Sequence, residues 1–285
     1  MSLFTVCCKA LFVFSCIRRQ SWLTLFLCIN RILVAARSMS HLAIPIRTFE
    51  EIDSTLFGPE TLVLLDLDNT VFASQTCYGS VEFFIHLVRD EMARRNISLD
   101  AAREIVGPRW KRAQDYITTQ LTHPNVPLFM DDVRARGGPL LALTARYPEV
   151  LPQTIGALEH HGVTFDAFGD LAFEKTYVHL DKHAPALLHK GVLFCHDLNS
   201  KGQVFEDFYA SFAQHRLEQG LPPIDRVVLV DDWVHNFESM EKAMEKLGIA
   251  FHGYHYQYAR HDFDLSRALA QEAHFLGGHV LGHAL

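Results

Sequence analysis

Five short apolar runs constrain the fold of this chain more than any other feature. None of them alternates between apolar and polar residues, as a strand with one face in water would. Each run is therefore predicted to be a strand buried on both faces. Because helical segments separate the runs, the pattern predicts an α/β fold with a parallel sheet and helices on both faces. The runs are Thr61–Leu65, Leu140–Leu143, Gly191–Cys195, Arg226–Val230 and Ile249–Tyr254.

The helical predictions come from apolar spacing and from residues that start or stop helices. Residues 80–95 carry an apolar stripe at helical spacing, and Ser98 is a suitable cap for the next helix. By contrast, residues 163–190 are less periodic and predict short strands or a loop. The predicted helices are 80–95, 98–106, 109–121, 148–161, the stretch after Lys201, and 236–247.

Polar side chains follow the ends of four predicted strands. Asp66 and Asp68 follow the first strand, and Thr144 ends the second. Ligands of an open parallel sheet bind at the carboxyl ends of its strands, so these groups are expected to converge on one edge. The third strand runs on to Lys201, and the fourth ends in Asp231 and Asp232.

Such a concentration of carboxylates predicts a cation. Several carboxylates within a few ångströms repel one another strongly and stay ionised together only around a positive ion. Because the set contains oxygen ligands and no His or Cys, it favours Mg²⁺. Together with the charge of Lys201 and the hydroxyl of Thr144, a metal of this kind suits a phosphoryl dianion.

These residues resemble the four motifs of the HAD (haloacid dehalogenase-like) superfamily. Leu64–Val71 is similar to the first motif, hhhDxDx[TV], and Leu141–Thr144 to the second, hhh[ST]. Lys201 at a helix start resembles the third motif, and Val228–Asp232 with Asn236 resembles the fourth in its DD form. The resemblance covers about residues 60–255 and implies a Rossmann-like fold.

Within that superfamily, the chain looks most like a group of uncharacterised HAD-like proteins known mainly from intracellular bacteria. The segment Phe251–Tyr256, which begins within the last predicted strand, supports this closer match.

The resemblance implies a phosphatase that uses Mg²⁺ and acts on a small phosphomonoester. Asp66 would be the nucleophile and form an aspartyl-phosphate, while Asp68 would act as acid and then as base. Thr144 and Lys201 would hold the phosphoryl oxygens, helped by the backbone amides of Leu67 and Asp68. The metal would be bound by the Asp66 carboxylate, the Asp68 carbonyl, Asp232, and Asp231 directly or through water.

Two other functions remain open. A phosphotransferase or mutase could use the same residues if a sugar hydroxyl rather than water accepts the phosphoryl group. Alternatively, the fold could serve as a binding or effector module without catalysis. Neither the substrate nor the oligomeric state can be predicted from the sequence.

The position of the helical block between the first two motifs resembles a small inserted cap. This resemblance divides the chain into a core of residues 39–78 and 128–285 and a cap of residues 79–127. A cap of this kind would cover the site, exclude water and select the substrate.

Lys201, Arg146 and Asn236 each have more than one interpretation. Lys175, Lys182 and Lys190 are alternative candidates for the lysine of the third motif, and Lys201 is favoured because it precedes an amphipathic helix. Arg146 could reach the substrate, although a surface position is favoured. Asn236 could cap a helix, contact a ligand, or do both.

Residues 1–38 are predicted to be a leader and stay outside the fold prediction. The first acidic residue is Glu50, whereas six basic residues precede it. Trp22–Ile29, with a basic pair before it and small residues after it, suits a secretory signal and an exported protein. An organellar transit peptide, or translation that begins at Met39 in a cytoplasmic protein, are the alternatives. Neither apolar run of the leader is long enough to span a membrane.

The net charge, the cysteines and the histidines bear on possible partners, disulfides and zinc sites. A net charge of −7 disfavours nucleic-acid binding, which usually needs a basic face. Cys77 and Cys195, the two cysteines of the body, suggest buried small residues rather than a disulfide framework. Several histidines crowd the last part of the chain but match no familiar zinc spacing, so a structural or surface role is expected. They are His252, His255, His261, His274, His279 and His283.

Overall fold

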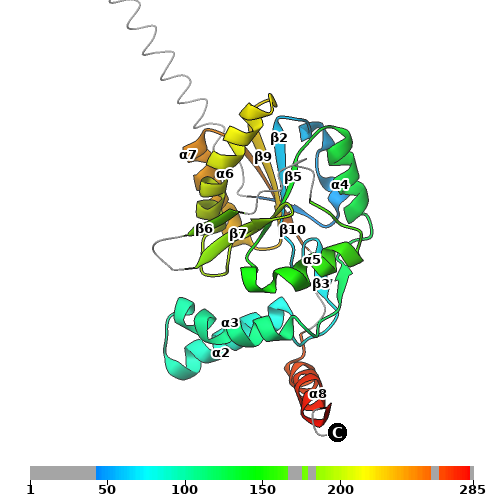
Figure 1. Cartoon of the computed structure of the whole chain (residues 1–285), viewed down its shortest axis with the longest axis vertical. Coiled ribbons are helices and arrows are strands. Elements are labelled where there is room, and N and C mark those ends of the chain that lie inside the picture. The colour runs from blue at the N-terminus through cyan, green and yellow to red at the C-terminus, as the bar shows by residue number, and fades with distance from the viewer. Residues whose placement is uncertain (1–42, 166–174, 179–183, 258–262, 283–285) are drawn as a thin grey trace, which may run out of the picture. The chain divides into compact units, whose positions relative to one another are not determined.

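The central sheet has the order β1-β10-β9-β2-β5-β8-β7-β6 in a computed structural model that describes residues 43–165, 175–178, 184–257 and 263–282 (Figure 1). The predicted leader, residues 1–38, lies outside these described residues. A separate two-stranded sheet pairs β3 (Phe72–Ser74) with β4 (Thr119–Leu121). The strands of the central sheet are β1 (Ile44–Ile46), β2 (Thr61–Leu65), β5 (Leu140–Thr144), β6 (Lys175–Val178), β7 (Pro185–His189), β8 (Val192–Phe194), β9 (Arg226–Asp231) and β10 (Ala250–Tyr256).

The strands from β1 to β8 in this order are parallel, which confirms the predicted α/β class. The expectation of a wholly parallel sheet is wrong at one edge, where β7 and β6 are antiparallel. Only Lys190 and Gly191 connect β7 to β8, and both have positive φ, 45° and 71°. Two such residues form a tight hairpin turn, and a tight turn can join only antiparallel strands.

The strand order reverses between β2 and β9. The strands that follow β2 in the central sheet, from β5 to β8, lie on one side of it, whereas β9 and β10 lie on the other side. In open α/β sheets, ligands bind outside the carboxyl ends of the strands at such a reversal. The strand order therefore predicts a ligand site at the carboxyl ends of β2 and β9.

Helices cover both faces of the sheet, as predicted (Figure 1). Val63 and Leu65 of β2 belong to one core, which also contains apolar residues of α4 and α5. Leu62 and Leu64 point to the opposite core, which α6 and α7 complete. The four helices are α4 (Val126–Ala135), α5 (Leu151–His160), α6 (Lys201–Glu218) and α7 (Val234–Leu247).

Several element predictions need correction. The predicted break before 109 is absent, because α3 (Leu99–Ala113) is continuous and contains Pro108, and the predicted helical end at 119–121 is instead β4. Helix α4 was not predicted, and Pro127 lies in its first turn, where proline is favoured. Strand β1 and helix α8 (Leu265–Gly282) were not predicted either. The predicted helix 148–161 begins as a 3₁₀ turn, Pro148–Val150, that leads into α5. Two further 3₁₀ turns, Phe49–Glu51 and Ser54–Leu56, precede β2.

The inserted helices α2 (Val81–Arg95) and α3 (Leu99–Ala113) pack together with α8. Gln271 of α8 accepts a 3.0 Å hydrogen bond from the amide of Tyr78, and Glu272 pairs with Arg109 of α3. The C-terminal helix therefore adds apolar and polar contacts to the insertion. A separate cap at 79–127 stays a prediction.

Among the helices in the described ranges, none combines the length and apolar composition needed to cross a membrane.

The packing of α6 on α7 can be tested at Gly202. A Cβ there would lie 2.1 Å from the backbone oxygen of Ser239. We expect Gly202→Ala to lower the free energy of unfolding by about 2 kcal/mol or more, because backbone cannot yield as a side chain can. Gly156→Ala is the matched control, since a Cβ at this helical position meets nothing within 4 Å. It should raise the free energy of unfolding by about 0.5–1 kcal/mol. If urea unfolding gave Gly202→Ala and Gly156→Ala the same free energy of unfolding, the close approach of α6 to α7 would be contradicted.

Candidate active site

Strand register brings the predicted residues of β2 and β9 to the same level. Leu65 pairs with Val230, so Asp66 and Asp231 come next on adjacent parallel strands. On the other side of β2, Leu65 pairs with Ala142, which places Thr144 level with Leu67. The predicted convergence at this sheet edge is therefore a direct consequence of the register.

Lys201 joins the two carboxylates. Its Nζ donates to Asp66 Oδ1 and to Asp231 Oδ2, each at 2.7 Å. All three side chains are at least nine-tenths buried. Lys201 is the first residue of α6, and Gly202 behind it lets this helix end approach α7.

Asp231 is also held by the start of α7. Its Oδ1 accepts from the Trp233 amide at 2.8 Å, and the Asn236 side-chain amide donates to both carboxylate oxygens at 2.9 Å. The interpretation of Asn236 as a helix cap is wrong, because α7 begins at Val234 and its N-cap is Trp233. Asn236 instead fixes the orientation of a buried carboxylate.

Three carboxylates form a group that could bind a metal ion. Asp66, Asp231 and Asp232 each offer an oxygen, and these atoms lie within 4.8 Å of one another. If all three are ionised, Lys201 balances only one of the three negative charges, so a divalent cation would neutralise the group. The donor set is all oxygen, which suits a hard cation.

Burial and neighbouring charges shift the pKa values of Asp66 and Lys201. Burial raises the pKa of Asp66 well above its ordinary value, and Lys201 only partly opposes this shift. Burial alone would lower the pKa of Lys201, but the adjacent Asp231 and Asp66 outweigh it and raise that pKa. Lys201 is therefore a fixed positive charge at neutral pH.

Asp68 lies apart from this group and pairs with Arg146. The guanidinium donates through Nε and Nη2 to the two oxygens of Asp68, at 2.8 and 2.9 Å. The favoured surface position of Arg146 is wrong, since only 4% of the residue is exposed. Its location two residues beyond the end of β5, the neighbour of β2, was the sequence signal that could have revealed this contact.

Thr144 is fully buried at the end of β5 and accepts a 3.2 Å hydrogen bond from the Arg146 amide. No hydrogen bond among the described residues joins Thr144 to Lys201 or Asp66. Among the residues that the structure describes, the amides of Leu67 and Asp68 donate to no main-chain carbonyl.

The competing residues lie elsewhere or are not described. Lys190 pairs with Glu159 on the surface, and Lys182 lies outside the described residues. The carboxylate group is the candidate metal cluster that the described ranges contain, and no histidine belongs to it. His255 does contact the site, with Nε2 3.2 Å from the Asp232 backbone oxygen. Cys195 is buried, whereas Cys77 is partly exposed, and neither forms a disulfide.

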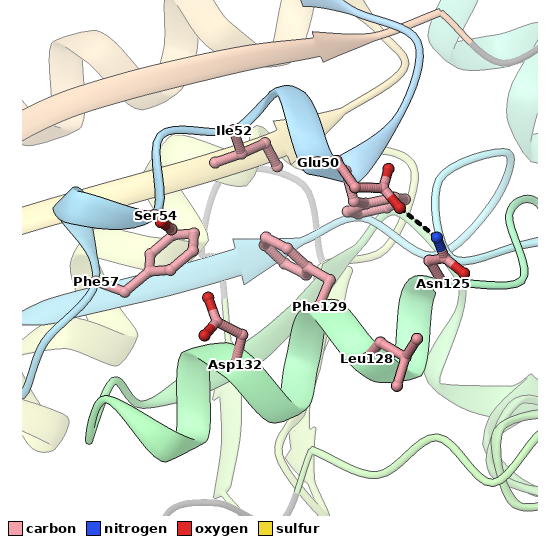
Figure 2. A pocket seen from close by; sticks show the side chains of 9 residues that line it. Glu50, Ile52, Ser54, Phe57, Asn125, Leu128, Phe129 and Asp132 are labelled. Carbon is pink, nitrogen blue, oxygen red and sulfur yellow. Dashed lines mark hydrogen bonds between the residues drawn. The ribbon is translucent and has the colours of Figure 1, made fainter.

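A separate apolar hollow of about 310 Å³ lies between α4 and the 3₁₀ turns that precede β2 (Figure 2). Figure 2 shows Phe57, Phe129 and Ile52 around it, with Glu50 and Asn125 hydrogen-bonded at one end. None of the predicted site residues lines it. Its chemistry is therefore unrelated to the carboxylate group.

Comparison with known proteins identifies one family. The model of a family described as "Protein of unknown function (DUF2608)" matches residues 45–276, which include every residue of the site. No curated protein matches the chain.

Replacement of Lys201 should make stability depend on pH. In metal-free buffer at pH 7, Lys201→Met leaves two buried carboxylates without a counter-ion, and we expect a loss of about 3–5 kcal/mol in the free energy of unfolding. Because the folded pKa of Asp66 exceeds the unfolded value of about 3.9, the folded state binds more protons. Proton binding to Asp66 therefore stabilises the folded state fully below about pH 4, and this stabilisation is lost as pH rises through the raised pKa of Asp66.

The deficit of Lys201→Met should therefore be smaller at pH 4 than at pH 7, as measured by urea unfolding with EDTA. Lys246→Met, which removes an exposed lysine paired with Glu206, should change stability little at either pH. A loss of the same size at both pH values would contradict the ionic role of Lys201.

Proposed function

The chain belongs to the DUF2608 family, and we propose that it is an Mg²⁺-dependent phosphatase of the HAD superfamily that hydrolyses a small phosphomonoester. The observation that carries this proposal is the convergence of Asp66, Lys201 and Asp231 at the reversal of the strand order. The three residues match the motifs that resemble the superfamily. Their contacts link positions that are far apart in the sequence.

The carboxylate group supports Mg²⁺ as the cofactor. Asp66, Asp231 and Asp232 supply oxygen ligands within reach of one ion, and the superfamily resemblance adds the Asp68 carbonyl. The bound cation would neutralise charge on the phosphoryl group and on the carboxylates. Lys201 supplies the positive charge that belongs to the protein itself.

Asp66 would act as the nucleophile. One of its oxygens attacks phosphorus, the bond from phosphorus to the ester oxygen breaks, and Asp68 donates a proton to the departing oxygen. In the second step, water attacks the aspartyl-phosphate while Asp68 takes back a proton. Inorganic phosphate leaves, and the Asp66 carboxylate is restored.

The chain offers further donors for the phosphoryl oxygens. Lys201 already contacts Asp66, and the amides of Leu67 and Asp68 point to no main-chain acceptor in the described structure. In this proposal, the inserted segment 79–127 is the cap that selects the leaving group.

Mg²⁺ should stabilise the folded protein. A ligand at 100 times its dissociation constant adds about 2.7 kcal/mol to the free energy of unfolding, so Mg²⁺ should raise the midpoint of thermal unfolding. Asp232→Asn should remove most of this increase, because it removes a ligand oxygen with its charge. Asp225→Asn, an exposed position just before the other end of β9, should keep the increase. An unchanged midpoint in wild type at millimolar Mg²⁺ would contradict the proposed metal site.

Hydrolysis of p-nitrophenyl phosphate tests the activity. We expect turnover that requires Mg²⁺ and that falls by a factor of about 10³ or more in Asp66→Asn, since the nucleophile is lost. Asp225→Asn serves as the control and should keep wild-type rates. Equal release of phosphate and p-nitrophenol identifies water as the acceptor, whereas excess p-nitrophenol in the presence of sugars indicates a phosphotransferase. Folded wild type that binds Mg²⁺ without turnover would favour a binding module.

A further inference from the structure

Arg146 is a buried cation whose contacts the predicted catalytic residues do not explain. It forms the bidentate pair with Asp68 and donates from Nη1 to the Thr154 hydroxyl at 3.1 Å. Its guanidinium carbon also lies 4.9 Å from the ring centre of Phe72 and 5.5 Å from that of Trp110. A charge with so little exposure is costly unless it is paired, so these contacts define one arrangement for it.

The contacts leave Arg146 poorly suited to bind substrate. All three guanidinium nitrogens already donate to groups of the protein. The side chain is only 3% exposed, whereas that of Asp68 is 22% exposed. Of this pair, Asp68 is therefore the member that can meet a substrate.

The pair restricts the orientation of Asp68. A single carboxylate in a loop can occupy several side-chain rotamers, and a planar fork that binds both oxygens selects one of them. The fork uses one lone pair of each oxygen and leaves the others available for hydrogen bonds or a proton. Asp68 can thus be held by Arg146 and still exchange a proton with a reacting group.

We propose that Arg146 is a positioning residue that orients Asp68 for its proton transfers. This inference rests on the proposed phosphatase function. Trp110 belongs to the inserted helix α3, so the insertion contributes to the wall around the guanidinium. The orientation of the acid group consequently depends on residues from the core and from the insertion.

Two aryl phosphates of similar shape separate this role from a structural one. Phenyl phosphate releases a phenol with a pKa of about 10 and needs protonation of its leaving oxygen, whereas p-nitrophenolate leaves readily as an anion. The kcat/KM value reports the first chemical step with each substrate. The ratio of the two values is independent of the folded fraction of a variant, since both substrates meet the same enzyme.

We expect Arg146→Gln to lower kcat/KM for phenyl phosphate about tenfold more than for p-nitrophenyl phosphate, because acid catalysis contributes on the order of 10²–10⁴ in rate. Asp68→Asn should change the ratio in the same direction. The double variant should be no worse than Asp68→Asn alone, since Arg146 acts through Asp68. Arg216→Gln is the matched control, because it removes another buried arginine, which donates to the carbonyls of Pro59 and Pro222 outside the site and the insertion, and it should leave the ratio unchanged.

Three results would overturn the inference. Equal losses with both substrates in Arg146→Gln indicate a structural role only. A rise in KM with unchanged kcat indicates direct binding of substrate. A double variant with the product of both single losses shows that Arg146 does not act through Asp68. Absence of turnover in wild type with either substrate would instead reject the phosphatase proposal itself, and the inference with it.

Discussion

The contact of the Lys201 ammonium group with two buried carboxylates holds the site together. It joins β2, α6 and β9, whose residues Asp66, Lys201 and Asp231 are distant in sequence. Two carboxylates at the ends of adjacent strands would repel each other in a medium of low dielectric constant, and the lysine compensates for this repulsion. It leaves a net negative charge when Asp232 is ionised as well, and that surplus suits the group to a divalent cation.

A second ion pair lies on the other side of the same loop. Asp68 faces Arg146 at the end of β5, whereas Asp66 faces Lys201 and β9. Two carboxylates separated by one residue thus have different partners and different exposure. In the proposed reaction, this separation allows Asp66 to attack phosphorus while Asp68 handles protons, because each environment favours a different task.

Much of the fold could be predicted from the apolar pattern, since a strand buried on both faces must have apolar residues throughout. The predictions were wrong where a local signal has two meanings. Proline can end a helix or occupy its first turn, and Pro127 lies in the first turn of α4, a helix that was not predicted. Lys190 and Gly191 form a hairpin that reverses the chain, so the sheet edge is antiparallel. Helix α8 was missed, and its partners α2 and α3 are remote in sequence.

The sequence by itself determined the α/β class and the residues at the strand ends, because periodicity and motif spacing are local properties. The residues predicted at these strand ends include all three members of the carboxylate group, Asp66, Asp231 and Asp232. Only the tertiary structure decided how these residues are paired. The register of β2 against β9 and β5 places Asp231 beside Asp66 and brings Arg146 to Asp68, and no local pattern specifies a contact between residues 78 positions apart. The burial of Arg146 was also decided by the tertiary structure. An arginine just beyond a strand is usually exposed, and only the packing of the surrounding elements buries this one.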